Sequence, residues 1–508
     1  GKRRNVQKFL YLCSANKSLI HKRLNIPYMF AKLNKIGELT KILSVKSDTS
    51  HAIMHFMRCF GIGRILSKHS LDKMRGRDMA EQILAMMVFR ILGETIGSLS
   101  TTQFHGVLEV GKNCFYRLLA RSEMDWRILQ LSMARRFQSI VRKENAEETD
   151  APKCYIIDDT TLAKTGFHLE GISRVFDHVI GKCVLGYKLL LLAFFDGRST
   201  YAVDLSIHRE TGKKGDFSLS KKERSMQFNK ERSESNPDYG RFKELDAKKN
   251  DNVVKMIERA YKSGIRAAYA LMDTWFVKPS LVCAVRKIAG GAIHIVGRLA
   301  MGKDRYAVGS RRYNVHELIS RHEREAVVCR KYKCMYFEQR VMMGDTYVKI
   351  FFIRVGRNKN WDAIVTTDTH MKFVKAFEIY QIRWNIEVLI KECRQYLGLG
   401  SYQGTDFDEQ IADCTLCLMT HMVLTLGQRF NEYEALGELF RETRRELFEL
   451  TQWRRTLEII KNLLNVLAIK LCINVADTME NLMQGTQAVS ELEAILLALS
   501  PSDAIAGH

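Results

Sequence analysis

The chain has 508 residues, 46% of them hydrophobic, and a formal net charge of +22 from 79 basic and 57 acidic residues. This composition excludes a wholly disordered chain and favours roughly two to four folded domains. The start of the chain lacks the apolar segment of a secretory signal, no apolar run reaches the length of a membrane span, and twelve cysteines are scattered along the chain. We therefore expect a reduced cytoplasmic protein without a membrane partner.

The first 148 residues are predicted to form a basic helical region. Residues 1–80 contain 17 Lys or Arg and 4 Asp or Glu, a net charge of +13, which leaves +9 for the other 428 residues. Clustered basic charge is typical of nucleic-acid-binding surfaces, although a generally basic solvated surface is the alternative. Residues 80–92 have the pattern of a core helix, and residues 106–121 that of a turn followed by a recognition-type helix.

Strand patterns begin after residue 148 and predict the first part of an α/β core over residues 149–290. An apolar run from Lys153 ends in Asp158 and Asp159, and the apolar run 267–272 ends in Asp273. Further strands are expected at 184–195 and 201–207. Residues 208–252 are highly charged and poor in large apolar side chains, which predicts a long loop or mobile excursion.

Alternating apolar and polar residues predict a β-rich insertion over residues 291–368. Residues 369–428 are predicted to complete the α/β core, and residues 429–508 to form amphipathic helices that could support dimerisation. Cys414, Cys417 and His421 have a spacing seen in zinc sites, but they lie in an apolar helix with no second ligand pair nearby in sequence. We interpret the two cysteines as buried helical residues.

One predicted helix within residues 369–428 has an unusual face. Tyr380, Arg383, Glu387, Lys391 and Arg394 follow one another by three, four, four and three residues, the steps that share a helical face. One stripe would therefore carry an aromatic hydroxyl, three cations and one acid. This stripe suits a phosphate backbone with a metal-binding carboxylate among the cations. The alternative for Glu387 is an ordinary ion pair on the helix face.

The strand-end acids and Glu387 could act together. Strand ends that meet in a sheet bring together carboxylates that are distant in sequence, and such a cluster repels itself unless cations bind it. Carboxylates with open water positions suit Mg²⁺, for which Mn²⁺ can substitute. Two such ions can activate a water or a 3′-hydroxyl and stabilise the leaving oxygen of a phosphodiester. The alternative is that each strand-end acid only caps the next element.

The order of the acids and the helix motif resemble the DDE transposases of bacterial insertion sequences, over residues 150–425. The resemblance is to the insertion-sequence-four superfamily, defined by a Tyr–Arg–Glu–Lys signature. Tyr380, Arg383, Glu387 and Arg394 have the signature's spacing, with two, three and six residues between them, and Arg394 replaces the final Lys while keeping its charge. Residues 157–161 and 271–276 are similar to the first two acid motifs.

The resemblance implies an RNase H-like catalytic core interrupted by the β-rich insertion, for which the 114-residue gap from Asp273 to Glu387 leaves room. It implies a cut-and-paste transposase that binds terminal repeats of double-stranded DNA, cleaves the ends with two divalent cations and joins the 3′-hydroxyls to target DNA. A homodimer would pair the two ends. The protein would lie in the bacterial cytoplasm, associated with the nucleoid when bound to DNA.

The resemblance also assigns roles to residues. One Asp of the first motif, Asp273 and Glu387 would bind the metals. The phosphates of the transposon end would be held by Tyr380, Arg383, Lys391 and Arg394, with Trp384 as a further DNA-binding feature of the same helix. Members of this group often cut through a hairpin intermediate and stack a flipped base on an aromatic ring. Candidates for that stacking are Trp275, Trp361 and Trp384, and core packing is the alternative for each.

The choice between Asp158 and Asp159 stays open in the sequence, because neighbouring strand residues face opposite sides. We favour Asp158, which directly follows the apolar run and matches an Asp-x-Thr-Thr pattern, with Asp159 as the alternative. Two other functions also stay open. One is an RNase H-like, metal-dependent DNA nuclease that never joins ends, and the other is a domesticated DNA-binding protein without catalysis.

Overall fold

The computed structural model describes residues 48–72, 78–100, 111–144, 151–356, 360–430, 433–449 and 452. The chain divides into two compact units, residues 1–96 with 113–446 and residues 97–112 with 447–508. Nearly all described elements belong to the first of these units. The predicted basic segment before residue 48, residues 106–110 of the predicted recognition-type helix and most of the predicted C-terminal helices lie outside the described residues.

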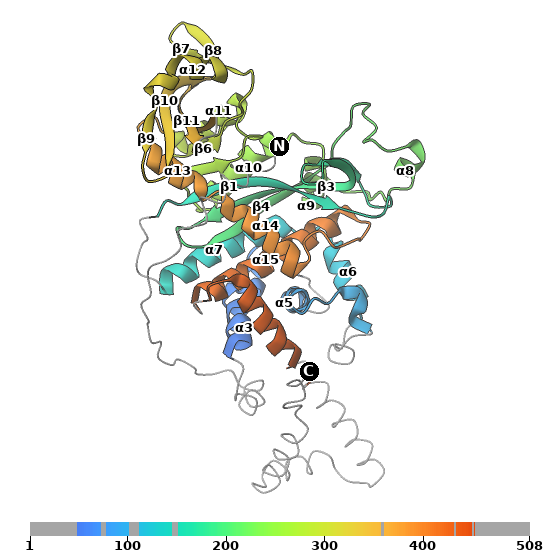
Figure 1. Cartoon of the computed structure of the whole chain (residues 1–508). Helices are drawn as coiled ribbons and strands as arrows, with labels where there is room; N and C mark the ends of the chain where they lie inside the picture. Colours follow the sequence, from blue (N-terminus) through green and yellow to red (C-terminus); the bar gives the residue numbers. More distant parts are fainter. Residues whose placement is uncertain are drawn as a thin grey trace, which may run out of the picture. The chain divides into compact units, whose positions relative to one another are not determined.

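A mixed sheet of twelve strands among the described residues forms the centre of the first unit (Figure 1). Its main path is β2-β3-β1-β5-β6-β12-β11-β10-β7-β8, with β4 paired to β3 and β9 paired to β10. The strands are β1 (Cys154–Ala163), β2 (Ser173–Asp177), β3 (Lys182–Phe195), β4 (Thr200–His208), β5 (Tyr269–Met272), β6 (His294–Arg298), β7 (Arg305–Val308), β8 (Arg311–Asn314), β9 (Val327–Cys329), β10 (Cys334–Met343), β11 (Thr346–Val355) and β12 (Asp362–Thr366).

Five of these strands place the acids. β4, β3 and β1 are antiparallel neighbours, whereas β1, β5 and β6 run parallel to one another. Residues 185–194 of β3 are all buried, so both faces of this strand are covered, which explains its unbroken apolar run. The parallel pairing of β1 with β5 ends at Ile157 and Met272, and Asp158 and Asp273 are the next residues.

The β-rich insertion continues the same sheet. β6 pairs with β12, β12 with β11, and β11 with β10, all antiparallel. The predicted strand content of residues 291–368 is therefore confirmed. Alternation along the sequence could not show that β6, at the start of this range, extends the parallel group, because the pairing of β6 with β5 depends on residues far apart in the chain.

Helices pack around the sheet, and α15 lies at the centre of the helical part. Residues 407–427 of α15 are almost all buried, and this helix packs against α3, α5, α7, α14 and β4. The described helices are α3 (Asp48–Phe60), α4 (Ile62–Lys68), α5 (Met79–Leu92), η1 (Ile96–Ser100), α6 (Asn113–Leu119), α7 (Trp126–Glu144), α8 (Lys221–Ser225), α9 (Pro237–Glu244), α10 (Lys249–Lys262), α11 (Pro279–Lys287), η2 (Ile288–Gly291), α12 (Val315–His322), η3 (Glu323–Glu325), α13 (Phe373–Gln381), α14 (Trp384–Leu397) and α15 (Phe407–Phe430).

Burial explains the composition of α15. In the described part of the chain it is the one helix long and apolar enough to cross a membrane, and its most apolar stretch is wholly buried inside the protein, as in a core helix. Cys414 and Cys417 are buried free thiols, which confirms their interpretation as packed helical residues. His421 bonds instead to Glu392, with 2.9 Å between His Nε2 and the carboxylate.

The charged segment 208–252 is not the long loop that its composition predicted, because it contains α8, α9 and the start of α10. Arg232 is buried and lies 2.6 Å from Glu170 and 3.2 Å from Asp408. Lys230 lies 2.5 Å from the same Asp408. The composition suggested that these charged side chains are solvated. They are instead paired with acids from distant segments, and this pairing allows the Arg232 side chain to be buried.

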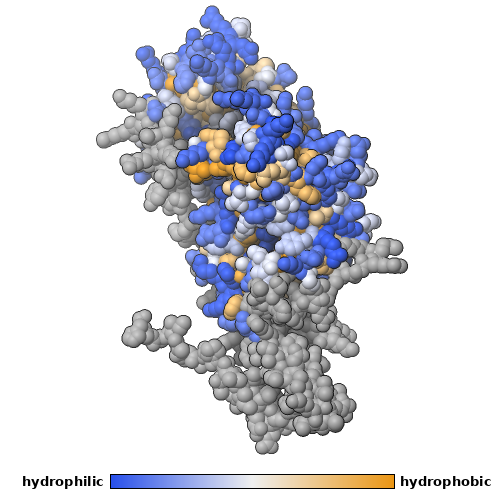
Figure 2. All heavy atoms as spheres, turned by 90° about the vertical axis from the view of Figure 1, so that its right-hand side faces the viewer, coloured by the Kyte–Doolittle hydropathy of each residue, from blue (hydrophilic) through white to orange (hydrophobic). Residues whose placement is uncertain are grey.

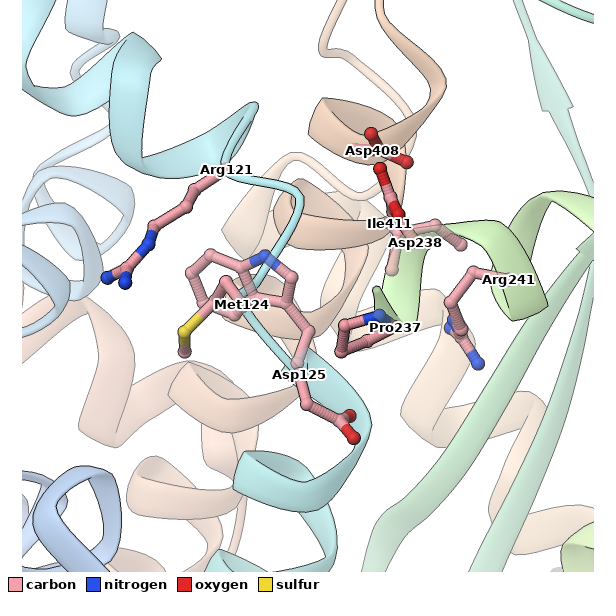
Figure 3. Close-up of a pocket in the computed structure, with 9 residues that line it drawn as sticks. Arg121, Met124, Asp125, Pro237, Asp238, Arg241, Asp408 and Ile411 are labelled. Atoms are coloured by element: carbon pink, nitrogen blue, oxygen red, sulfur yellow. The ribbon is translucent and has the colours of Figure 1, made fainter. Parts of the chain in front are cut away.

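A small cavity lies beside this ion-pair cluster (Figure 3). It has a volume of about 10 Å³, and its lining includes Trp126, Asp238 and Asp408. Neither the Trp126 indole nitrogen nor the two Asp238 oxygens have a hydrogen-bond partner among the described residues. The volume is close to what one buried water needs, and the unsatisfied groups supply both a donor and acceptors for it.

Candidate active site

Asp158 and Asp273 lie at the same level of two adjacent parallel strands, directly after the last paired residues, Ile157 and Met272. Asp273 follows the end of β5, whereas β1 does not end in the two acids as predicted but continues through them to Ala163. In the pairing of β1 with β5, Ile157 lies opposite Met272, and the next residue in each strand is an acid. Neighbouring strands are about 4.8 Å apart, so the two backbones carry these carboxylates side by side. Pairing of β5 with β6 places Gly297 opposite Met272, so Arg298 is the corresponding next residue of the third strand.

Asp159 lies away from this group. Its carboxylate forms an ion pair with the ammonium of Lys249, at the start of α10. Successive residues of β1 face opposite sides of the sheet, so Asp158 and Asp159 cannot serve the same site from one strand. The structure thus groups Asp158, and not Asp159, with the other predicted acids.

The predicted single helix through Tyr380 and Arg394 is in fact two helices. α13 ends at Gln381, α14 begins at Trp384, and Ile382 and Arg383 form a turn between them. The amide of Arg383 donates to the carbonyl of Tyr380 over three residues instead of four, with an N···O distance of 3.0 Å. This tighter turn was missed because the sequence between the two helices contains neither Gly nor Pro.

Arg383 ties two of the acids together. One of its terminal nitrogens bonds to the Glu387 carboxylate, and the other lies 3.6 Å from the Asp158 carboxylate. Asp273 is close enough to act electrostatically on both Arg383 and Glu387. Acids from two parallel strands and one helix therefore surround one guanidinium group.

Burial makes Asp158 and Glu387 hard to ionise. Desolvation raises the pKa of Asp158 from 3.8 to about 7; the Arg383 charge opposes this shift, and the charges of Asp159 and Glu387 add to it. Desolvation also raises the pKa of Glu387, with Arg383 again opposing it and Asp273 adding to it. Such a cluster of carboxylates gains from an additional positive charge, which is the electrostatic requirement of a cation site.

The other residues of the predicted DNA-binding face divide into two groups. Tyr380 and Arg383 are buried, and burial raises the pKa of the Tyr380 hydroxyl. Lys391 and Arg394 are exposed, and Trp384 is 40% exposed. Arg394 also anchors α14 to β1, donating to the Thr160 hydroxyl at 2.7 Å and to the Thr161 carbonyl at 2.6 Å.

Arg298 is a residue of this site that the sequence analysis missed. Its guanidinium binds the Asp362 carboxylate through two nitrogens, at 3.0 and 2.7 Å, and its charge acts on Tyr380. The same strand-end rule that selected Asp158 and Asp273 could have found it, since Arg298 ends the third parallel strand.

The three tryptophans considered for base stacking differ in environment. Trp275 follows Asp273 by two residues and is 66% exposed. Trp361 packs edge-on against Phe337 at 5.1 Å, and the Arg354 guanidinium covers its ring at 4.8 Å. Trp384 begins α14 directly after Arg383. Trp275 and Trp384 therefore present surface to solvent beside the acids, whereas Trp361 is largely packed within the insertion.

The acids of this site are of the type that binds metal ions, but they are not arranged as a complete set of metal ligands. Among the described residues, no three His, Cys, Asp or Glu side chains are arranged closely enough to hold a metal ion. Arg383 lies between Asp158 and Glu387, and its positive charge stands in for that of a cation. Carboxylates are the preferred ligands of Mg²⁺ and Mn²⁺, so Asp158, Asp273 and Glu387 fit such an ion in chemistry.

Comparison with protein families gives a match over part of this site. Residues 70–302 match the DDE superfamily endonuclease family. The match includes Asp158, Asp159 and Asp273 and ends before Glu387. A DDE endonuclease domain implies an RNase H-like core, cleavage of phosphodiester bonds and a DNA substrate, and DDE nucleases typically use divalent metal ions. The mixed α/β sheet agrees with that core. A search of curated proteins gave no match.

Proposed function

We propose that the chain is a cut-and-paste DNA transposase of the insertion-sequence-four type. The observation that carries the proposal is the link from Arg383 to both Glu387 and Asp158, at the sheet edge where Asp273 also ends its strand. Asp158 and Glu387 are 229 residues apart in the chain. Acids that only capped their own elements would not need to gather around one guanidinium.

In this proposal, Asp158, Asp273 and Glu387 hold divalent cations, and Arg383 holds the carboxylates together when no cation is bound. The bound ions would supply an activated water or 3′-hydroxyl and stabilise the leaving oxygen of the phosphodiester. Asp158 must give up its proton to act as a ligand, and its raised pKa makes that step sensitive to pH near 7. Asp159 serves a structural role with Lys249.

DNA would be held by cations outside the acid cluster. Lys391 and Arg394 are the exposed basic residues of α14 and would bind phosphates of the transposon end. Arg394 bonds to Thr160 of β1, two residues after Asp158. This bond keeps Arg394 close to the acid cluster. The basic segment 1–80 would recognise terminal repeats, and two protomers would pair the two DNA ends.

The proposal is tested with duplex oligonucleotides spanning each end of the DNA element that encodes the chain. The unaltered protein with Mg²⁺ should nick these ends, and it should join pre-cut ends to a plasmid. Asp273→Ala and Glu387→Ala should lose both activities while still binding the ends. Asp159→Asn is the matched control, because it changes an acid on the same strand that is paired with Lys249, and it should retain cleavage.

The joining step separates the proposed function from its nearest alternative. The family match is to endonucleases, so a metal-dependent nuclease that cuts without joining is the second candidate. Cleavage of ends without transfer of pre-cut ends would favour that nuclease. End binding without any metal-dependent cleavage, unchanged by the two alanine variants, would favour a DNA-binding protein without catalysis.

A further inference from the structure

The turn between β2 and β3 exposes an unusual amount of apolar surface. Val179 is 78% exposed and Ile180 53% exposed at the tip of this hairpin, and Phe176 on its stem is 38% exposed. Large apolar side chains at such a tip increase the apolar area in contact with water, which costs free energy in the isolated protein. The face shown in Figure 2 is largely hydrophilic, with hydrophobic patches among the hydrophilic residues.

The turn has a defined conformation. The Asp177 carboxylate accepts hydrogen bonds from the amides of Val179 and Ile180, at 2.8 and 3.3 Å, and the Asp177 carbonyl accepts one from Gly181 at 2.8 Å. Gly181 has a φ of 68°, a left-handed conformation that glycine adopts without strain. Because the Asp177 carboxylate and backbone hydrogen bonds shape this turn, the two aliphatic side chains are held at its tip.

The hairpin contacts the segment that follows Asp273. The His178 ring is 4.9 Å from the Phe176 ring and 5.8 Å from the Trp275 ring. Trp275 follows Asp273 by two residues. A continuous set of exposed apolar and aromatic groups therefore leads from the end of β5 to the turn.

Cations accompany this apolar surface. An open hollow of about 650 Å³ beside the hairpin stem is lined in part by Arg174, Lys213 and Lys214. Cys183, which pairs with Phe176 across the hairpin, also lines it, so the hollow and the turn belong to the same part of the surface. Glu210 and Asp216 contribute acids to the lining, but cations outnumber them. Basic groups beside an apolar tip suit DNA, whose phosphates need cations.

We infer that the β2–β3 turn is an apolar wedge that inserts between base pairs of duplex DNA beside the scissile phosphate. This inference rests on the proposed function. Proteins that open or kink duplex DNA insert apolar side chains between base steps, at a cost of a few kcal/mol per step. Val179 and Ile180 would enter the stack, and the nearby aromatic groups would cover the exposed bases. A protein partner fits less well, because these few side chains fall far short of the roughly 800 Å² per partner of a stable interface.

The test compares the double variant Val179→Ser/Ile180→Ser with Val327→Ser/Val328→Ser. The second pair is a matched control, since Val327 and Val328 are 52% and 68% exposed on β9, which pairs with β10 toward the opposite end of the sheet from β2 and β3. The probe is an end duplex with 2-aminopurine beside the cleavage position, whose fluorescence rises when its base unstacks. A second substrate carries mismatches at the same position, so that no wedge is needed.

The unaltered protein and the control variant should raise the fluorescence, and the wedge variant should not. The wedge variant should cleave the paired duplex roughly ten- to a hundredfold more slowly and the mismatched duplex at nearly the normal rate. Equal loss on both substrates, no loss on either, or a changed oligomeric state of the wedge variant would overturn the inference. If the unaltered protein cuts neither substrate, the proposed function fails, whereas the fluorescence signal still decides whether the turn unstacks bases.

Discussion

Replacing Asp158 by Asn should make the metal-free protein more stable at neutral pH. Burial raises the pKa of Asp158 from 3.8 to about 7, so the folded protein holds this proton more tightly than the unfolded chain does. The stability that this proton contributes is complete below about pH 4 and is lost as the pH rises through 7. Asn keeps the shape of the side chain and never ionises, so it removes this loss.

The size of this stability change follows from the shift in the pKa of Asp158. A difference of about 3 pKa units corresponds to at most ~4 kcal/mol, and the slope between pH 4 and 7 is about 1.4 kcal/mol per pH unit. The Asp158 side chain is 20% exposed, so solvent screens its charge, and Arg383 opposes the shift. We therefore expect a stability change smaller than this upper limit. The free energy of unfolding of Asp158→Asn should therefore exceed that of the unaltered protein by about 1 kcal/mol at pH 5, rising to about 3 kcal/mol at pH 8.

Urea unfolding at pH 5, 6, 7 and 8 without divalent ions measures this difference. Asp159→Asn is the control, because it leaves Asp158 beside Arg383 and should keep the pH slope of the unaltered protein. The reasoning about a buried acid cluster is refuted if the Asp158→Asn curve runs parallel to that of the unaltered protein. The same variant should lose metal-dependent cleavage, so stability and activity would change in opposite directions.

Four further changes test other contacts. Arg383→Gln leaves two acids without their shared cation and should lower the free energy of unfolding by about 3 kcal/mol, with Mg²⁺ restoring part of it in urea unfolding. Arg429→Gln is the control, because it breaks a buried ion pair with Asp196 away from the acid cluster. It should lower the free energy of unfolding by a similar amount, and Mg²⁺ should restore none of it. Arg232→Met should cost about 3–5 kcal/mol and speed proteolysis near residues 226–238. Arg394→Ala should weaken DNA binding and reduce its salt slope by about 1, measured by titration at several salt concentrations.

Sequence patterns predicted the parts of this site that depend on local order. The apolar runs before Asp158 and Asp273 are strands, and Glu387 lies on a helix, as their periodicities indicated. The patterns could not give the pairing of Ile157 with Met272, because this register joins residues 115 positions apart and depends on the whole sheet. That register, together with the Asp159–Lys249 pair, separates the two neighbouring acids in the structure.

Other features were missed because they depend on partners from distant segments. Arg232 and Lys230 look like solvated charges in sequence, but both pair with acids from distant segments, and these pairs allow the Arg232 side chain to be buried. The insertion shows its strands by alternation, whereas its continuation of the core sheet depends on the pairing of β12 with β6. Local pattern therefore determined the elements, and long-range pairing determined the site.

The segment from Tyr380 to Arg394 divides into buried and exposed residues, and this division changes what Arg383 can do. A guanidinium aimed at a phosphate should reach solvent, but Arg383 is buried and its nitrogens face Glu387 and Asp158. Its charge is therefore used to hold acids that would otherwise repel one another. Cations that bind these acids would take over that task and free the guanidinium for a phosphate placed between them. Lys391 and Arg394, already exposed, need no such release, so DNA could bind them before the acid cluster is filled.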